Sequence, residues 1–288
     1  MLPRERLVFA NGLSHHVVEW GDPHARESFV LCHGFLDLAW GFAELGALIA
    51  AAGYRAIAFD FRGHGESGRV PAGGYYYFPD YVLDMHELLP QLLDQPFHLL
   101  GHSMGGTACT LYAATHPERI RTLSLLEGLG PNMEAPERAL PRLQSWLNEA
   151  VRARTEGPQK LRDLDEAFAR LSTRHRHVAP AFLRLLADKS TEPHPSGDGL
   201  RWRFDPLHRT FAPAAFDRAR FGACLRAITA PTLVLQGEHG FRSRDDDERI
   251  ALLATHKRVV LAGAGHMLHW THGTEIARLV AEHASALA

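Results

Sequence analysis

Residues 97–106 read Phe-His-Leu-Leu-Gly-His-Ser-Met-Gly-Gly, an apolar run followed by a serine with glycines on both sides. The apolar run is typical of a short buried β-strand, and residues 105–115 have the pattern of a helix. A serine on such a tight turn has a strained backbone and leaves no room for bulky neighbours. Gly101 and Gly105 provide that room. The sequence therefore predicts an exposed Ser103 hydroxyl beside a helix N-terminus, whose free N–H groups favour developing negative charge.

Strand and helix patterns alternate on both sides of this stretch. A hairpin is predicted around Asn11-Gly12, and short apolar runs follow at 29–32, 54–59 and 121–126. Helical patterns separate these runs, the clearest of them at 79–93. Short apolar strands that alternate with helices indicate an α/β fold with a mostly parallel sheet and helices on both faces.

The alternation stops at residue 131, and only helical patterning is present up to residue 230. Pro180 and Pro213 are placed to begin helices, and residues 190–199 indicate a loop. The strand-helix rhythm returns from residue 232. We therefore expect a helical cap formed by residues 131–230, inserted into an α/β core formed by residues 1–130 and 231–288.

Composition excludes several classes of protein. The 288 residues contain 31 Lys and Arg against 33 Asp and Glu, so the basic excess of a nucleic-acid-binding protein is missing. There is no run of 18 apolar residues and no apolar leader, so neither membrane insertion nor secretion is expected. Three widely spaced cysteines favour reduced thiols over a disulfide framework. We expect a cytoplasmic protein.

The charge is unevenly distributed along the chain. Residues 131–230 carry 17 Arg and Lys against 12 Asp and Glu, whereas the remaining residues carry 14 against 21. The simpler interpretation is that opposite charges help the insert to dock on the core. The alternative is an insert that attracts anionic substrates.

Four motifs together resemble the α/β-hydrolase-fold serine hydrolases that carry a helical cap. These are His33-Gly34, the loop from Asp60 to Ser67 (DFRGHGES), the GHSMGG stretch, and Gly263-Ala-Gly-His266 near the end. The resemblance covers nearly the whole chain outside the insert. It implies this fold, with the active site at the ends of the parallel strands.

The resemblance also implies roles for individual residues. Ser103 corresponds to the nucleophile, and His266 to the base that must take its proton, since a serine hydroxyl alone is a weak nucleophile. The backbone N–H groups of Phe35 and Met104 correspond to the oxyanion hole. His33 and His102 match positions that are usually structural in the family.

The catalytic triad of this family consists of the serine, the histidine and an acid. The acid in this chain departs from the usual family pattern. Its common position, three residues past Gly237, is Gly240, which has no side chain. Some relatives take the acid from the end of the preceding strand, and here that position is Glu127. A carboxylate at the end of an apolar strand is costly unless it is paired, and a histidine that it orients would be such a partner. Glu238 and the run Asp245–Asp247 remain alternatives.

The implied reaction is hydrolysis of a small-molecule carboxylic ester or lactone through an acyl-enzyme on Ser103. It requires no metal or organic cofactor, and neither nucleic acid nor membrane is expected as a partner. Carbon–carbon bond hydrolases and cofactor-free perhydrolases use the same residue set, and a non-catalytic binder with this fold is a further alternative. Epoxide hydrolases use an aspartate nucleophile and cap tyrosines, whereas all six tyrosines of this chain precede the insert.

Overall fold

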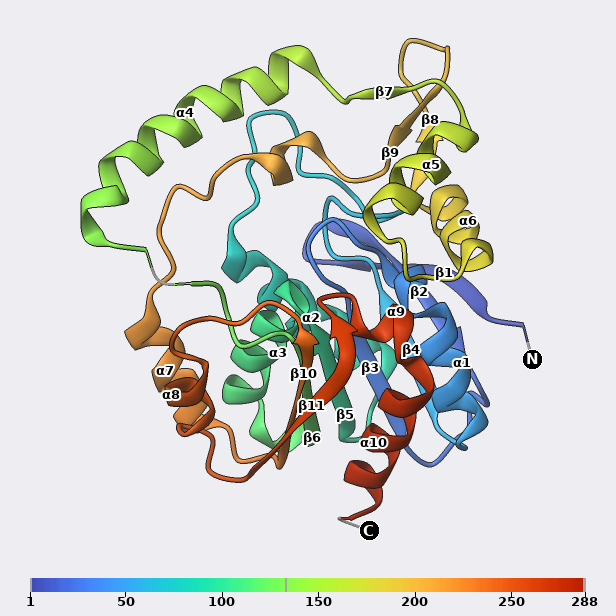
Figure 1. Ribbon diagram of the computed structural model, residues 1–288, viewed down its shortest axis with the longest axis vertical. Coiled ribbons are helices and arrows are strands. Elements are labelled where there is room, and N and C mark those ends of the chain that lie inside the picture. The colour runs from blue at the N-terminus through green and yellow to red at the C-terminus, as the bar shows by residue number, and fades with distance from the viewer. Residues whose placement is uncertain (1, 133, 287–288) are drawn as a thin grey trace.

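The computed structural model describes residues 2–132 and 134–286, so Met1, Met133, Leu287 and Ala288 of the predicted core and cap ranges lie outside it. Within the described residues, eight strands form one sheet in the order β1-β2-β4-β3-β5-β6-β10-β11 (Figure 1). The strands are β1 (Arg4–Ala10), β2 (Leu13–Trp20), β3 (Ser28–Cys32), β4 (Arg55–Phe59), β5 (Phe97–His102), β6 (Ile120–Leu126), β10 (Thr232–His239) and β11 (His256–Gly265).

The sheet is mostly parallel, as predicted. β1 and β2 form the antiparallel hairpin at one edge and β2 pairs antiparallel with β4, whereas β4, β3, β5, β6, β10 and β11 are parallel to one another. His102 lies opposite Leu126 in the pairing of β5 with β6, and Leu126 lies opposite Leu235 of β10. The residues that follow these strands, Ser103 and Glu127 among them, therefore emerge at one edge of the sheet.

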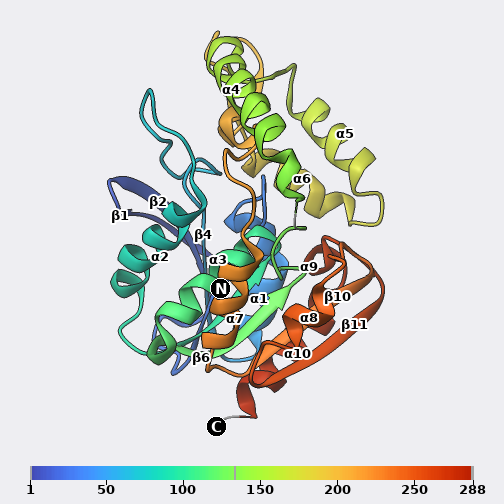
Figure 2. The same ribbon diagram turned by 90° about the vertical axis from the view of Figure 1, so that its left-hand side faces the viewer.

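Helices cover both faces of the sheet, because alternate residues of each central strand are apolar on both sides (Figure 2). Val30 and Cys32 pack into one core cluster, and Phe29 and Leu31 pack into the other. The first cluster includes residues of α2 (Phe78–Leu92), α3 (Met104–Thr115) and α7 (Arg218–Ala227), and the second includes residues of α1 (Ala43–Ala51) and α10 (Gly273–Ser285). The α/β fold class is confirmed.

The segment between β6 and α7 lies above the carboxyl edge of the sheet (Figures 1 and 2). It contains α4 (Ala139–Glu156), α5 (Leu164–Arg174) and α6 (Pro180–Lys189), which begins at the predicted proline. The prediction of helices alone was incomplete, because three short strands, β7 (Lys160–Leu161), β9 (Leu200–Trp202) and β8 (Thr191–Pro193), form a second sheet here. The prediction of a helix at Pro213 was wrong, since α7 begins only at Arg218. The division into core and cap stays a prediction.

The apolar repeat of α4 points into solvent. Leu140, Leu147 and Val151 are 65%, 52% and 60% exposed, and Ala150 is the helix's one buried residue within the described chain. Ala150 packs in a small cluster with Tyr75 and Leu207. The helix therefore has a small apolar contact with the rest of the molecule, and it also makes polar contacts, such as the hydrogen bond that Arg154 donates to the Gly74 carbonyl oxygen. Among the described residues, none of the helices is both long enough and apolar enough to pass through a lipid bilayer.

Candidate active site

Ser103 occupies the turn between β5 and α3 in a strained conformation. Its φ is 51° and its ψ is −116°, a region that residues with a side chain rarely adopt. A Cβ on Gly101 would lie 2.6 Å from the Gly105 carbonyl oxygen, and one on Gly105 would lie 2.2 Å from the Cys32 carbonyl oxygen. The predicted need for glycine on both sides is therefore confirmed by the packing, which leaves the serine held on a sharp bend.

His266 follows β11 and faces the serine. Its Nε2 lies 3.1 Å from the Ser103 Oγ, which is hydrogen-bond distance for removing the hydroxyl proton. The ring of His102 supports this residue, because the His102 Nε2–H donates to the His266 carbonyl oxygen at 2.9 Å. His102 thus positions the backbone of His266, in agreement with the structural role predicted for it.

Glu127 reaches the other nitrogen of the same imidazole. Its Oε2 lies 3.3 Å from His266 Nδ1, and its Oε1 accepts a hydrogen bond from the Gly237 N–H at 2.7 Å. The side chain is fully buried, whereas that of His266 is 39% exposed. A buried carboxylate needs such partners to offset the loss of water. The structure thus brings Ser103, His266 and Glu127 together as the sequence predicts, and their catalytic roles stay predictions.

The other candidate acids lie elsewhere. Glu238 is exposed, and its Oε2 accepts a hydrogen bond from the Gly263 N–H. The run Asp245–Asp247 precedes and begins a short helix, α8 (Asp246–Ile250). Each of its carboxylates has a side-chain partner, and these partners are Arg249, Gln236 and Arg258 respectively.

Two backbone segments border the serine where an oxyanion hole is predicted. Met104 is the first residue of α3, so its N–H has no partner within the helix. Phe35 follows Gly34, where an added Cβ would lie 3.3 Å from the Ser103 Cβ and 2.6 Å from His102 Nδ1. The Phe35 loop therefore passes close to the serine, and the oxyanion role of the two N–H groups stays a prediction.

Two clefts meet at the serine. One has a volume of about 490 Å³ and extends beneath α5 and β9, and the other has a volume of about 640 Å³ and extends beneath the segment around Leu207. Phe35, Ser103 and His266 line both of them. Volumes of this size suit small molecules. The hydroxyl of Ser103 is thus reached from two sides.

The second cleft contains three of the tyrosines that precede the insert in the sequence. Tyr75, Tyr76 and Tyr81 line it together with Ser103. They precede the insert in the chain, but the loop before α2 and the start of that helix bring them up to the serine. The only signal in the sequence is the run of three tyrosines at 75–77.

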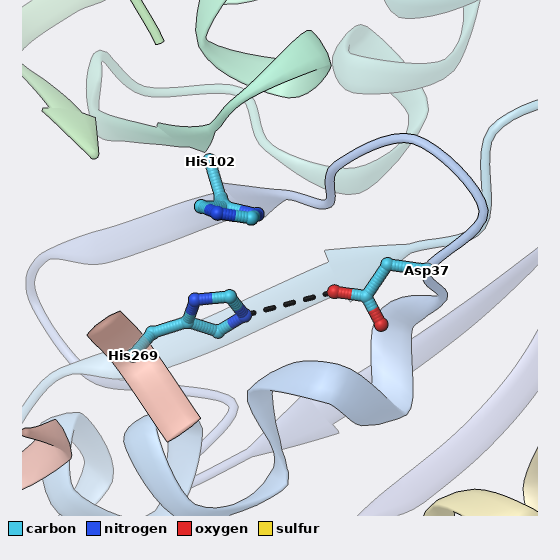
Figure 3. A group of neighbouring side chains, drawn as sticks. All are labelled: Asp37, His102 and His269. Carbon is cyan, nitrogen blue, oxygen red and sulfur yellow. Dashed lines mark ion pairs between the residues drawn. The ribbon is translucent and has the colours of Figure 1, made fainter. Parts of the chain in front are cut away.

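A buried polar cluster lies next to the site and could be considered for a metal (Figure 3). The ligand atoms of Asp37, His102 and His269 all lie within 4.8 Å of one another, and His269 Nε2 is 3.6 Å from Asp37 Oδ2. The two imidazole rings are packed with their centroids only 4.3 Å apart, which is closer than two rings converging on one ion would lie. A metal would therefore require these rings to separate.

Burial controls the protonation of this cluster. It raises the pKa of Asp37 to about 6 and lowers that of His269 to about 3. Burial, followed by the neighbouring histidines, also holds the pKa of His102 well below its usual range. Both imidazoles are therefore neutral near pH 7, which suits the packing of one ring against the other.

Comparison with known proteins agrees with this geometry. The family model described as alpha/beta hydrolase fold matches residues 27–273. A serine hydrolase-like protein of Danio rerio is 38% identical over 112 residues, which cover 38% of this chain and 33% of that protein. A serine hydrolase-like protein of Dictyostelium discoideum is 24% identical over 237 residues, which cover 80% and 65%. The chain thus spans from a third to about two thirds of the length of these curated relatives.

Several solved structures match over almost their whole length. The thioesterase domain from the curacin biosynthetic pathway superposes with a TM-score of 0.87 at 27% identity, covering 97% of this chain and 99% of that domain. The fold, the serine turn and the family match together place this chain in the α/β-hydrolase-fold family.

Proposed function

We propose that this protein is a serine hydrolase that cleaves a small-molecule carboxylic ester or lactone through an acyl-enzyme on Ser103. The observation that carries the proposal is the continuous hydrogen-bonded series from Ser103 Oγ through His266 to Glu127. Such a series activates a serine hydroxyl, because the base removes its proton while the acid stabilises the resulting imidazolium.

The reaction would proceed in two acyl-transfer steps. His266 takes the Ser103 proton as the oxygen attacks the carbonyl carbon, and the N–H groups of Phe35 and Met104 stabilise the oxyanion. The imidazolium then gives its proton to the departing alcohol, which leaves the acyl group on Ser103. A water molecule, deprotonated by the same imidazole, releases the acid and restores the serine.

The likeness to a thioesterase domain supports acyl transfer as the reaction class, since thioesters and esters are cleaved through the same tetrahedral intermediate. The relatives named as serine hydrolase-like are consistent with it. Carbon–carbon bond hydrolysis or cofactor-free perhydrolysis by the same triad is the second candidate, because it uses the same three residues.

Epoxide hydrolysis has less support even though tyrosines line one cleft. The Tyr76 hydroxyl donates to Asp205 and the Tyr75 hydroxyl donates to the Phe211 carbonyl oxygen. The third, Tyr81, has its hydroxyl 3.2 Å from His208 Nδ1. These hydroxyls are already occupied, and the nucleophile position is a serine rather than an aspartate.

The proposal also includes a cytoplasmic location. Cys32, Cys109 and Cys224 are all free thiols, and the first two are buried. Unpaired cysteines of this kind are typical of a reducing compartment.

The test is hydrolysis of p-nitrophenyl butyrate combined with labelling by a fluorophosphonate. The wild-type protein is expected to hydrolyse the ester and to be labelled at Ser103, and Ser103→Ala is expected to lose both properties. Labelling without turnover of any ester would favour the second candidate or an unrelated acyl substrate. Neither labelling nor turnover in a folded wild-type protein would identify it as a non-catalytic binder.

A further inference from the structure

The cleft beneath α5 and β9 is strongly cationic. The segment above the sheet contributes four arginines to its lining, and the one carboxyl group in that lining within the described chain is Asp37, which is almost fully buried. The four arginines are Arg170, Arg174, Arg203 and Arg209.

Two of these arginines have no protein partner. Arg170 donates to Glu166 at 2.6 Å, and Arg203 lies 3.4 Å from Glu66. By contrast, Arg174 and Arg209 form no ion pair and no side-chain hydrogen bond with any residue in the described ranges. Most arginines of the same segment do have acidic partners, for example Arg142, Arg184 and Arg201.

These free guanidinium groups come from separate elements. Arg174 ends α5, and Arg209 ends the 3-10 helix Pro206–Arg209. Like charges that gather in one cleft repel one another unless an anion neutralises them. A cationic cleft also raises the local concentration of anions and speeds their capture.

The other cleft has no arginine or lysine among its lining residues in the described chain. Its lining is mainly aromatic and aliphatic, and the hydroxyls of Tyr75 and Tyr76 are directed into hydrogen bonds with the chain. The one carboxyl group among its lining residues in the described chain is Glu127, which is held by His266 and Gly237. This cleft therefore suits an uncharged, apolar group.

We infer that the substrate is an ester with an apolar group on one side of the carbonyl and an anionic group on the other, a carboxylate or a phosphate. Arg174 and Arg209 bind the anion, and the aromatic cleft binds the apolar part, so that the ester carbonyl is placed at Ser103. A guanidinium group matches the paired oxygens of both anions. This inference rests on the proposed ester hydrolysis.

The experiment compares matched esters that differ only in charge. In the first arm, the mono-p-nitrophenyl ester of glutarate is compared with its methyl ester, so that the anion lies on the acyl side. In the second arm the anion lies on the leaving-group side, and 4-butyryloxybenzoate and 4-butyryloxyphenyl phosphate are compared with their neutral methyl and dimethyl esters. In at least one arm we expect kcat/KM to be tenfold or more higher for the anionic ester.

The variants are Arg174→Gln and Arg209→Gln, with Arg176→Gln as the matched control. Arg176 is exposed, lies two residues from Arg174 and does not line either cleft. Each cleft variant is expected to lower the ratio of anionic to neutral kcat/KM about tenfold, and high salt should lower it as well. The control should leave the ratio unchanged. The cleft variants should keep the wild-type melting temperature, because both side chains are exposed.

The inference fails if every anionic ester and its neutral counterpart are hydrolysed at equal rates, or if the cleft variants keep the wild-type ratio. In either case Ser103-dependent hydrolysis of the neutral esters would leave the proposed function intact. If no ester is hydrolysed, the proposed function fails. Binding of glutarate and of inorganic phosphate, measured by calorimetry on wild type and on Arg174→Gln, then decides whether the cleft holds an anion.

Discussion

Glu127 Oε2 lies 3.3 Å from His266 Nδ1, and the same carboxylate accepts the Gly237 N–H through its other oxygen. Gly237 belongs to the strand after which the acid of this family commonly stands. The carboxylate of Glu127 thus follows β6 and is held in place by a backbone N–H of β10. This arrangement would allow Glu127 to serve as the acid where Gly240 has no side chain.

Replacing Glu127 by glutamine should lower kcat by about 10³- to 10⁴-fold, because the imidazole loses the anion that fixes its tautomer and stabilises its cation. The amide oxygen can still accept the Gly237 N–H, so the fold should persist. Steady-state kinetics with p-nitrophenyl butyrate would measure the loss. The control is Glu238→Gln, which changes an exposed carboxylate and should leave kcat near the wild-type value. A large effect of the control alone would show that Glu127 is not the acid.

Moving the carboxylate from residue 127 to residue 240 should restore part of the activity that is lost in Glu127→Gly. A Cβ on Gly240 would lie 2.0 Å from Glu127 Oε1, so the two positions compete for the same space. Gly240→Asp alone is therefore expected to lower kcat, and so is Glu127→Gly. The double variant Glu127→Gly/Gly240→Asp should exceed Glu127→Gly by tenfold or more. Equal rates for these two would show that a carboxylate from residue 240 does not reach His266.

The strained serine should reduce the stability of the protein. Because Ser103 has a φ of 51°, Ser103→Gly should relieve strain that Ser103→Ala keeps. We expect the glycine variant to be more stable than the alanine variant by about 1 kcal/mol, after the greater chain entropy of glycine is taken into account. Urea unfolding of the two inactive variants measures this difference directly. A more stable alanine variant would contradict the strain.

The buried His98 should make the protein less stable in acid. Burial, followed by the positive charges of Arg121 and His283, lowers the pKa of His98 to about 4. As the pH falls from about 6.5 to about 4, the unfolded chain binds a proton at this position and the folded protein does not, so stability is lost. The loss is about 1.4 kcal/mol per pH unit within that window.

The variant His98→Gln isolates this contribution, and glutamine can still bond to Thr122, the present partner of the ring. Other titrating groups affect both proteins alike. The free energy of unfolding of the wild type relative to the variant should therefore fall by about 2 to 3 kcal/mol between pH 7 and pH 4.5. Unfolding curves with parallel pH dependence would show that His98 titrates normally.

The sheet could be predicted because its signals are local, and the residues that meet at the candidate site could be predicted because they lie in motifs that resemble those of the family. Ser103 is marked by a strand, a turn and a helix within twenty residues, and Gly240 rules out the usual acid without any knowledge of the fold. The cationic cleft could not be predicted in this way. Arg174 and Arg209 are brought together only by tertiary packing, and the sequence could show an excess of positive charge but not where it gathers.

The segment above the sheet was also harder to predict for a second reason. Strands of two or three residues, such as β7, β8 and β9, are too short to show an alternating pattern. The repeat that includes Leu140 and Leu147 predicts a helix correctly, but an apolar stripe is normally taken to face a core. Here the stripe faces solvent, so periodicity identified the element and not its orientation.

The small apolar contact of α4 has an evolutionary consequence. The one buried residue of the helix in the described chain, Ala150, belongs to a small cluster, whereas the two large apolar clusters lie on either side of the sheet. Substitutions in α4 should therefore be tolerated with little loss of stability. Selection can vary this helix, which packs on Tyr75 and Leu207 of the aromatic cleft, while the residues around Ser103 are inherited unchanged.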